Sequence, residues 1–332
     1  NGVYPEAITR CLDHLLRDGR ARLVVFSGDM VRGAAAPARL ASQLETWKQL
    51  IQPYRDRGVE FLVTSGNHEI QDAAQLEFAP GRFGRPTEEA RAKLAVLEAS
   101  FPELPRNGPA GGGLTYWARR GDVLFVVLDA YRPGSFHTVD TDWLAATLEG
   151  PAAQPAPRHI FVATHAPAFP AGGHLFDSLS NFNLDRAAAA RRGVNVWPWR
   201  PGSGGPLDVD VDWRPRRDRL WRLLAAHRVT ALVAGHEHNL SAQRVDGVWQ
   251  LVAGALTERL YPANQVPVAL YGGQAQNPQA AAGSFWSGSD RVWGYLLVVV
   301  DGAGAEAIAY GWTADQPAVR EIKRVRLRAA VP

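Results

Sequence analysis

One apolar run that ends in a pair of histidines constrains the fold of this chain more than any other feature. The run Val229–Val233 has the pattern of a β-strand, and Gly235-His236-Glu237-His238 follows it closely. Residues two apart in an extended backbone point to the same side, so the two histidines can face one point while the glutamate turns away. Imidazole is the commonest metal ligand among side chains. The stretch therefore indicates a metal site at the end of a strand.

Four other strand-like runs also lead into polar side chains. Ligands collect outside the carboxyl ends of strands in sheets of this kind, so we expect these side chains to lie together. Oxygen and imidazole donors suit Mn²⁺, Fe, Zn²⁺ or Mg²⁺ rather than soft ions. Glycine before three of the strand-end ligands allows a sharp turn and a close approach of the backbone to a ligand. The four predicted strands, 22–26, 60–64, 122–128 and 158–164, end at Asp29, Asn67, Asp129 and His165.

Segments with helical spacing alternate with these strands along the chain. The sequence has no internal repeat of 20–50 residues and no linker, which predicts a single domain over residues 1–332. Residues 167–213 form a long polar and aromatic insertion near the predicted site, and residues 292–332 supply strands that close the sheets. The predicted helices are 5–17, 38–54, 86–99, 142–148 and 215–227, and the later strands are 249–253, 292–301 and 306–312.

The charge pattern argues against a nucleic-acid-binding surface. The net charge is +3, and most basic residues are scattered arginines. One denser basic group near the C-terminus predicts a solvated edge strand that discourages edge pairing. No run of 18 or more apolar residues occurs, so no membrane span is expected. The basic group consists of Arg320, Lys323, Arg324, Arg326 and Arg328.

The single cysteine, Cys11, excludes an intrachain disulfide and a thiolate metal cluster. It lies on the apolar face of the first predicted helix, which predicts burial rather than reactivity. The sequence starts at Asn1 rather than at Met. We therefore expect N-terminal residues to have been removed, and a cleaved targeting signal would account for this.

As a set, the strand-end motifs resemble the calcineurin-like metallophosphoesterases, whose pattern is GD…GNH[DE]…H…GHxH. The resemblance covers roughly residues 20–310. It implies an α/β fold in which two mixed β-sheets pack as a sandwich flanked by helices, with a dinuclear metal centre at one end. The matching segments are Gly28-Asp29, Gly66-Asn67-His68-Glu69, Thr164-His165 and Gly235-His236-Glu237-His238.

The resemblance also implies a role for each matching residue. Asp29 would bridge two metal ions, while Asn67, His165 and His236 would complete one metal site and His238 would serve the other. His68 would protonate the leaving oxygen or bind the phosphoryl group, and Glu69 would orient His68. Two cations of this kind clamp the phosphoryl oxygens and activate a bridging hydroxide for attack on a phosphate mono- or diester.

Two departures from the family pattern are clear. The family opens with an Asp-x-His type of motif, and nothing before Asp29 matches it. Residues 1–20 resemble the helix that follows that motif's strand, so we expect the strand to lie upstream of Asn1. The purple acid phosphatase branch has GDxxY, but Arg32 stands at the tyrosine position, so a coloured Fe(III) enzyme is not predicted. The start at Asn1 and the habits of the family favour an exported protein over a cytoplasmic one.

Five further residues are candidates for substrate binding or for support of the metal ligands. Arg32 and Arg132 could bind a phosphate in bidentate fashion, although exposed ion pairs are the commoner fate of such arginines. Asp129 is either a metal ligand or a group that caps its loop. Trp197 and Trp199 lie in a loop framed by proline and glycine. They could form a substrate wall, or they could anchor the loop on the scaffold.

The leading functional prediction is therefore a dinuclear metal-dependent phosphoesterase that acts on a small-molecule phosphate ester. The sequence does not distinguish monoesters from diesters, and it leaves the metals and the oligomeric state open. A non-catalytic metal-binding scaffold of the same fold is the alternative, which the intact His68 and Gly235-His236-Glu237-His238 argue against. A nuclease of the same superfamily is a further alternative, and the absence of a dense basic groove counts against it.

Overall fold

The computed structural model describes most of the chain outside the predicted insertion. The predicted substrate residues Trp197 and Trp199 and nearly all of the insertion at 167–213 lie outside the described residues, as do most of residues 270–288. The described residues are 4–17, 21–33, 36–71, 87–133, 135–170, 179, 214–257, 260, 285–287, 292–301 and 304–329.

Seven of the described strands form one mixed sheet. Four of them, β4, β7, β8 and β10, run parallel to their neighbours, and antiparallel strands extend the sheet at both ends. Every residue of β7 is buried, as expected for an apolar strand covered on both faces. The order is β11 (Phe285–Ser287), β9 (Leu240–Val245), β10 (Val248–Ala253), β8 (Ala231–Ala234), β7 (His159–Ala163), β4 (Val123–Val127) and β3 (Tyr116–Arg120).

A second layer of strands faces the seven-stranded sheet, and it consists of two separate pieces. One piece is the parallel pair β1 (Leu23–Phe26) and β2 (Glu60–Val63). The other is an antiparallel sheet of β12 (Trp293–Asp301), β13 (Gly304–Trp312) and β14 (Arg320–Ala329). Phe161 and Trp249 of the first layer pack against Ala307 of the second. The fold is thus the predicted sandwich of two β-layers.

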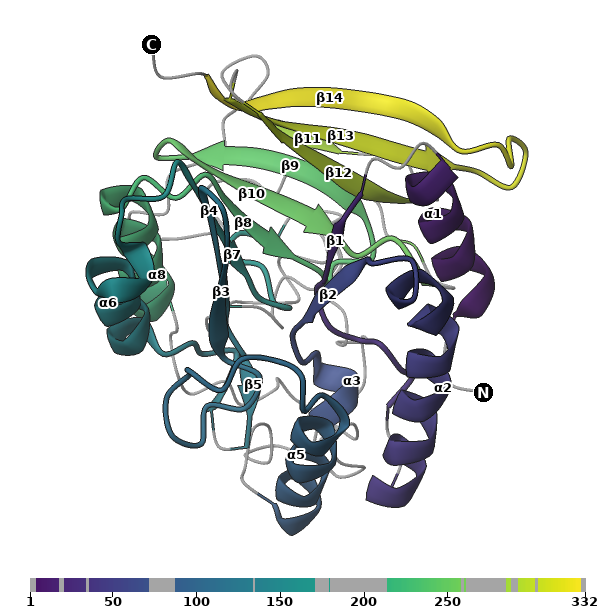
Figure 1. Cartoon of the computed structure of the whole chain (residues 1–332), viewed down its shortest axis with the longest axis horizontal. Helices are drawn as coiled ribbons and strands as arrows, with labels where there is room; N and C mark the ends of the chain where they lie inside the picture. The colour runs from purple at the N-terminus through teal and green to yellow at the C-terminus, as the bar shows by residue number, and fades with distance from the viewer. Residues whose placement is uncertain are drawn as a thin grey trace, which may run out of the picture.

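Helices cover both flanks of the sandwich. Figure 1 shows α6 and α8 on one flank, with α1 and α2 on the opposite one. In α2, Trp47 is fully buried, and its ring meets Phe26, Phe61 and Phe101 edge to face. The helices are α1 (Pro5–Arg17), α2 (Pro37–Arg55), α3 (Asn67–Ile70), α5 (Glu88–Ser100), α6 (Thr141–Glu149), the 3-10 turn η1 (Pro151–Ala153) and α8 (Arg214–Ala226). A short hairpin joins β5 (Tyr131–Arg132) to β6 (Ser135–Phe136).

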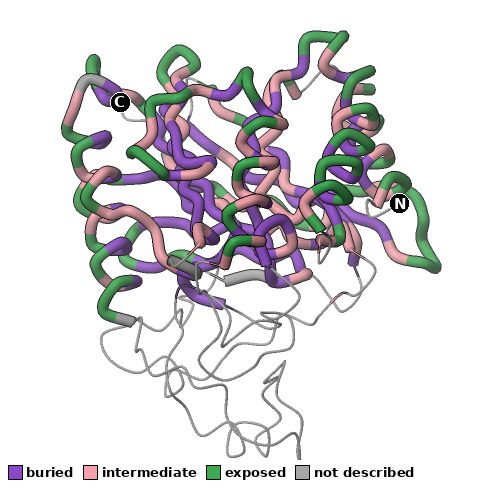
Figure 2. Tube along the Cα trace, turned by 90° about the horizontal axis from the view of Figure 1, so that it is seen from below, coloured by how far each residue is buried: buried purple, intermediate pink, exposed green. Residues whose placement is uncertain are grey.

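Burial follows this layering. Figure 2 shows the buried residues in the interior of the molecule, while exposed residues follow the outer turns of the helices. Cys11 is buried on α1, as its helical spacing predicts, and burial raises the pKa of its thiol. Within the part of the chain that the structure describes, no helix combines the length and the apolar character needed to cross a membrane.

The basic group near the C-terminus lies on β14, which pairs with β13 and with no other described strand. Lys323, Arg324 and Arg326 are exposed there. Arg324 forms ion pairs with Glu306 and Glu321. This arrangement agrees with the predicted solvated edge strand, because charged side chains hinder the addition of a further strand.

Candidate metal centre

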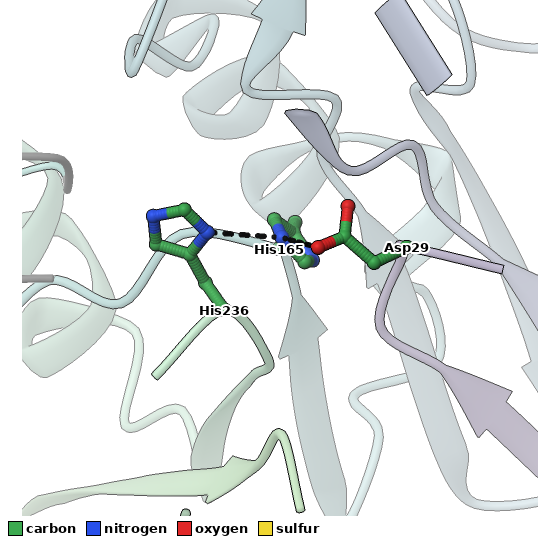
Figure 3. A group of neighbouring side chains, drawn as sticks. All are labelled: Asp29, His165 and His236. Atoms are coloured by element: carbon green, nitrogen blue, oxygen red, sulfur yellow. Dashed lines mark hydrogen bonds and ion pairs between the residues drawn. The ribbon is translucent and has the colours of Figure 1, made fainter. Parts of the chain in front are cut away.

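Four candidate ligands come together at the carboxyl ends of four strands. Asp29 lies after β1, and Asn67 is the first residue of α3, which follows β2. His165 and His236 lie after β7 and β8. Figure 3 shows Asp29, His165 and His236 pointing toward one another from three different elements. One donor atom from each of these three lies within 4.8 Å of the donors from the other two.

His165 stands at the centre of the group. Its Nε2 lies 3.2 Å from Asp29 Oδ2, 3.1 Å from Asn67 Oδ1 and 3.1 Å from His236 Nδ1. Its Nδ1 lies 2.5 Å from the carbonyl oxygen of Ser27, a contact that requires the ring proton at Nδ1. Nε2 then presents its lone pair to the other three donors. Lone pairs facing one another repel unless a cation or a proton lies between them.

The residues fit a divalent cation on three counts. Metal-ligating histidines usually donate their other N–H to a carbonyl or carboxylate, as His165 does to Ser27. Ligands held 2.0–2.2 Å from one tetrahedral ion are roughly 3.4 Å from each other, close to the separations around His165. Asn67 donates from Nδ2 to Gln71 Oε1 at 3.2 Å, which turns its carbonyl oxygen toward His165. The described part of the chain therefore holds a group of side chains suited to a metal ion.

Backbone strain is concentrated at the same residues. Asp29, His236 and His238 have φ angles of 55°, 66° and 52°, in the left-handed region that few residues other than glycine adopt. Such conformations cost about 1–3 kcal/mol each and persist where the surrounding structure enforces them. Three strained residues in one set of candidate ligands support a functional role for the set.

Gly66 allows the loops of β1 and β2 to pack against each other. Its φ is −106°, an ordinary value, so its conformation alone does not require glycine. A Cβ added to Gly66 would lie 2.1 Å from Asp29 Oδ1 and 2.5 Å from the Asp29 nitrogen. Gly66 is therefore needed for its small size, because any side chain would push the Asp29 carboxylate out of the ligand group.

Gly66→Ala is expected to weaken Mn²⁺ binding by roughly tenfold or more, because support of the ligand geometry carries that much metal affinity. Titration calorimetry measures the effect directly. Gly121→Ala is the control, because Gly121 has a φ of 57° and a Cβ there would meet no atom within 4 Å. The control should lose stability through strain and keep its Mn²⁺ affinity. Equal Mn²⁺ affinity in the Gly66→Ala variant and the wild type would contradict the packing argument.

The electrostatics also favour a positive charge in this group. Burial acts to raise the pKa of Asp29, but the charges of His165 and His68 outweigh it and hold the pKa well below its usual range. Burial acts to lower the pKa of His165, but the charge of Asp29 outweighs it and raises the pKa. The two shifts share one contribution, which is the attraction between the Asp29 carboxylate and positive charge on the His165 ring. A bound cation would meet the same attraction.

Glu69 holds the loop that carries Asp29. Its buried carboxylate accepts hydrogen bonds from the backbone nitrogens of Gly66 at 2.7 Å, Asp29 at 3.0 Å and Val31 at 3.1 Å. Burial, followed by the negative charge of Asp29, raises the pKa of Glu69 to about 7. The sequence-based expectation was that Glu69 orients His68, but the hydrogen bonds of its carboxylate go to the backbone instead. Glu69 therefore acts on the position of Asp29.

His68 lies beside the ligand group and is partly exposed. Its Nε2 is 3.9 Å from Asp29 Oδ2, and its backbone nitrogen donates to Asp29 Oδ1 at 3.1 Å. Its Nδ1 lies 2.5 Å from the carbonyl oxygen of Arg32, which fixes the ring. The guanidinium of Arg32 lies 5.5 Å from the centre of the Tyr4 ring. Both His68 and Arg32 line the cavity that contains the ligand group.

Three other predicted residues, His238, Asp129 and Arg132, lie outside the compact group of candidate ligands. His238 lines the same cavity as Asp29 and His236, but it is not part of the compact group of three. Asp129 is buried, and its carboxylate accepts from the backbone nitrogens of Leu114 and Tyr131 at 3.2 and 2.8 Å, which holds its loop. Arg132, on β5, is half-buried, and its charge acts on Asp129.

Two aromatic residues that the sequence did not single out as part of the centre lie behind the ligands. Tyr131 is fully buried, and its ring centre is 5.5 Å from that of His165 and 6.1 Å from that of His236. His137 is also buried, and its ring centre lies 5.0 Å from that of Tyr131. These rings limit the rotation of the two ligand imidazoles. The sequence signal for Tyr131 near the site is its position two residues after Asp129, which ends a predicted strand.

A comparison with protein-family models matches residues 3–240 to the calcineurin-like phosphoesterase model. A search of curated proteins gives no significant match. Among solved structures, the purple acid phosphatase PPD1 from yellow lupin (Lupinus luteus) seeds superposes with a TM-score of 0.57 at 14% identity, over 98% of this chain and 49% of that chain. GAP50, described as the anchor in the inner membrane complex of Plasmodium, gives 0.50 at 10% identity, over 99% of this chain and 84% of that chain. The chain thus spans about half the length of the lupin protein. At these identities the likeness shows the fold alone.

Proposed function

Because the chain belongs to the calcineurin-like phosphoesterase family, we propose that it is a metal-dependent hydrolase of small phosphate esters. The observation that carries the proposal is the convergence of Asp29, Asn67, His165 and His236 on one point at the strand ends. A metal-binding scaffold would share this convergence, but it would not need His68 beside the candidate ligands. The position of His238 on the same cavity supports a second metal site that shares Asp29.

In the proposed reaction, each residue of the chain has a separate task. Asp29, Asn67, His165 and His236 would hold one cation, and Asp29 and His238 would hold the second. When bound, the cation pair supplies charge for the phosphoryl oxygens and lowers the pKa of a coordinated water. His68 donates a proton from Nε2 to the departing alkoxide, and the Arg32 carbonyl keeps that nitrogen facing the cavity. The guanidinium of Arg32 provides a bidentate contact for the phosphate at the mouth.

The test is hydrolysis of p-nitrophenyl phosphate and its bis ester by the metal-loaded protein, with Mn²⁺, Zn²⁺ and Mg²⁺ each supplied after chelation. We expect activity to disappear with the chelator and to return with at least one metal. His68→Ala should lower kcat for an alkyl phosphate by about 10²–10⁴ while the bound metal stays unchanged, because it removes a proton donor and no ligand. The loss should be smaller for p-nitrophenyl phosphate, whose leaving group needs little protonation. The ratio of the two rates decides between monoesterase and diesterase activity.

The non-catalytic scaffold gives a different pattern. It predicts a rise in melting temperature on addition of Mn²⁺ without hydrolysis of either ester. Activity in the His68→Ala variant equal to that of the wild type would remove the proposed acid from the mechanism. Activity that persists after complete removal of metal would contradict the proposed function itself.

A further inference from the structure

A chain of buried polar contacts runs from α5 to the candidate metal centre. Figure 1 shows α5 beside α3, the short helix that begins at Asn67. Lys93 of α5 donates from Nζ to the carbonyl oxygen of Gln71 at 2.7 Å, and Gln71 Oε1 accepts from Asn67 Nδ2 at 3.2 Å. Asn67 Oδ1 in turn lies 3.1 Å from His165 Nε2. All four residues are buried, so these contacts lie away from bulk water.

Lys93 fixes the backbone of Gln71. Gln71 ends α3 with a ψ angle of 129°, so its carbonyl group turns away from the helix. The last carbonyl oxygens of a helix have no partner within it, and a lysine side chain is one of the groups that supply one. Lys93 is 1% exposed and also forms an ion pair with Glu89 at 3.0 Å. Lysine is almost never buried to this degree unless it is paired.

The side chain of Gln71 determines which end of the Asn67 amide faces the candidate ligands. The two ends of an asparagine amide have nearly the same size, but only the oxygen has lone pairs to offer a cation. A reversed Asn67 would place an N–H group against the lone pair of His165 Nε2 and close the site to a metal ion. Because Gln71 Oε1 only accepts, it bonds to Nδ2 and leaves Oδ1 for the ligand group.

One polar group of Gln71 remains for the cavity that contains the candidate ligands. Gln71 lines that cavity together with Asp29 and His68. Its backbone N–H donates to the carbonyl oxygen of Asn67 at 2.8 Å, its carbonyl oxygen accepts from Lys93, and its Oε1 accepts from Asn67. In the described part of the chain, its Nε2 makes no hydrogen bond. Gln71 thus has two N–H donors for a molecule in this cavity.

A phosphoryl oxygen is the acceptor that suits these donors. Gln71 is 2% exposed, and buried polar groups are rarely left without a partner. An apolar molecule would provide no acceptor. A carboxamide is also neutral, so it attracts a phosphate without repelling the cations that the neighbouring candidate ligands would hold. A cationic side chain at the same position would repel them.

The same orientation of Gln71 serves both ligands. If the Gln71 amide were reversed, Oε1 would face the phosphoryl oxygen and Nε2 would face Asn67. Asn67 would then turn its own N–H group toward the metal ion. A bound metal ion and a bound phosphate therefore favour the same orientation of the two amides. Two ligands that favour one state strengthen the binding of each other, and this coupling is reciprocal.

We propose that Gln71 binds a phosphoryl oxygen through Nε2 while its Oε1 orients Asn67, so that the phosphate and the metal ion bind cooperatively. Gln71 is thus a contact for the substrate and a positioning residue for the metal site. The identity of the anion rests on the proposed function, but the binding itself does not require hydrolysis.

Titration calorimetry with Mn²⁺ and with inorganic phosphate, on the whole protein, tests both ends of Gln71. Gln71→Met nearly keeps the size of the side chain and removes its polar atoms. It should weaken Mn²⁺ binding about tenfold, and it should weaken the binding of inorganic phosphate to the Mn²⁺-loaded protein about tenfold. Gln43→Met is the control, because Gln43 is buried on α2 and does not line the cavity. The control should leave both affinities unchanged.

A second background separates orientation from general damage to the fold. Asn67→Asp has an oxygen at both ends of the side chain, so its orientation no longer matters to a metal ion. Adding Gln71→Met to Asn67→Asp should therefore leave Mn²⁺ affinity unchanged, while phosphate affinity still falls. A damaged fold would lower Mn²⁺ affinity in both backgrounds.

Two results would overturn the proposal. One is equal affinity of the Mn²⁺-loaded wild type and Gln71→Met for inorganic phosphate, which would remove the contact through Nε2. The other is an equal loss of Mn²⁺ affinity with Asn67 and with Asn67→Asp, which would make Gln71 a purely structural residue. Cooperative binding that is lost in Gln71→Met, in a protein that hydrolyses no ester, would contradict the proposed function and support this inference.

Discussion

Asp29→Ala is expected to remove metal binding at the bridged position and to lower the rate of phosphate ester hydrolysis by about three orders of magnitude or more. Asp29 contributes the only carboxylate among the three residues whose donor atoms lie within 4.8 Å of one another. The two histidines left behind carry no charge to balance a divalent ion. Metal content by mass spectrometry and the initial rate on p-nitrophenyl phosphate measure the two effects.

Two control variants separate charge from structure in this experiment. Asp29→Asn keeps an oxygen that can accept from the His68 nitrogen, a contact of 3.1 Å in the wild type, but it removes the negative charge. It should fold normally and still lose most of the activity. Asp122→Ala removes an exposed aspartate outside the cavity lining and should leave both measurements unchanged. Wild-type metal content and rate in Asp29→Ala would refute the assignment of Asp29.

Glu69→Ala is expected to lower the stability of the protein by about 3 kcal/mol or more. Three backbone N–H groups, those of Gly66, Asp29 and Val31, would lose their acceptor in a buried place. Each unsatisfied buried donor costs about 1–3 kcal/mol. The melting temperature should fall by roughly 4 °C or more, and metal affinity should fall with it because the Asp29 loop loses its support. Thermal unfolding followed by circular dichroism gives the first effect.

Glu321→Ala is the matched control for this variant. Glu321 is exposed and pairs with Arg324 on β14, so its loss should change stability by less than about 0.5 kcal/mol. Glu69→Gln keeps one oxygen as an acceptor, so its melting temperature should lie between those of Glu69→Ala and Glu321→Ala. If Glu69→Ala and Glu321→Ala melt at the same temperature, the three hydrogen bonds of Glu69 do not hold the loop.

Two strands that lead toward the site could be predicted because each is a nearly continuous apolar run. β4 and β7 are of this kind, and their bounds lie within a residue of the predicted ones. β9 was missed, because its sequence Leu240–Val245 contains Gln243, a polar residue that is buried in the structure. Gln243 donates to the carbonyl oxygen of Phe169, a partner 74 residues away. A tertiary contact of this kind leaves no periodic pattern in the sequence.

β3 was missed for a different reason. It is the edge strand of the seven-stranded sheet, and its residues alternate between buried and partly buried. Its sequence, Tyr116–Arg120, ends in two arginines and resembles a loop. The short strand β11 is also absent from the strands that the sequence predicts. It pairs with β9, so its strand character depends on a neighbour that was also missed.

At the site, the candidate ligands could be predicted to lie together from their strand-end positions, because parallel strands place their carboxyl ends together. The supporting contacts did not follow from them. The carbonyl that holds the ring of His68 belongs to Arg32, and this contact depends on the packing of two loops. The left-handed conformation of His236 and the burial of Tyr131 behind it are also properties of the folded chain. Residue types predict the candidate ligands, and only the fold shows which contacts orient them.

The most direct test of the account is anomalous diffraction from a crystal soaked in Mn²⁺. The account predicts an anomalous peak about 2.0–2.4 Å from Asp29 Oδ2, Asn67 Oδ1, His165 Nε2 and a ring nitrogen of His236, with a second peak roughly 3.5–4 Å away, toward His238. A crystal saturated with Mn²⁺ that shows no peak among these four side chains, or only a peak elsewhere on the molecule, would contradict it.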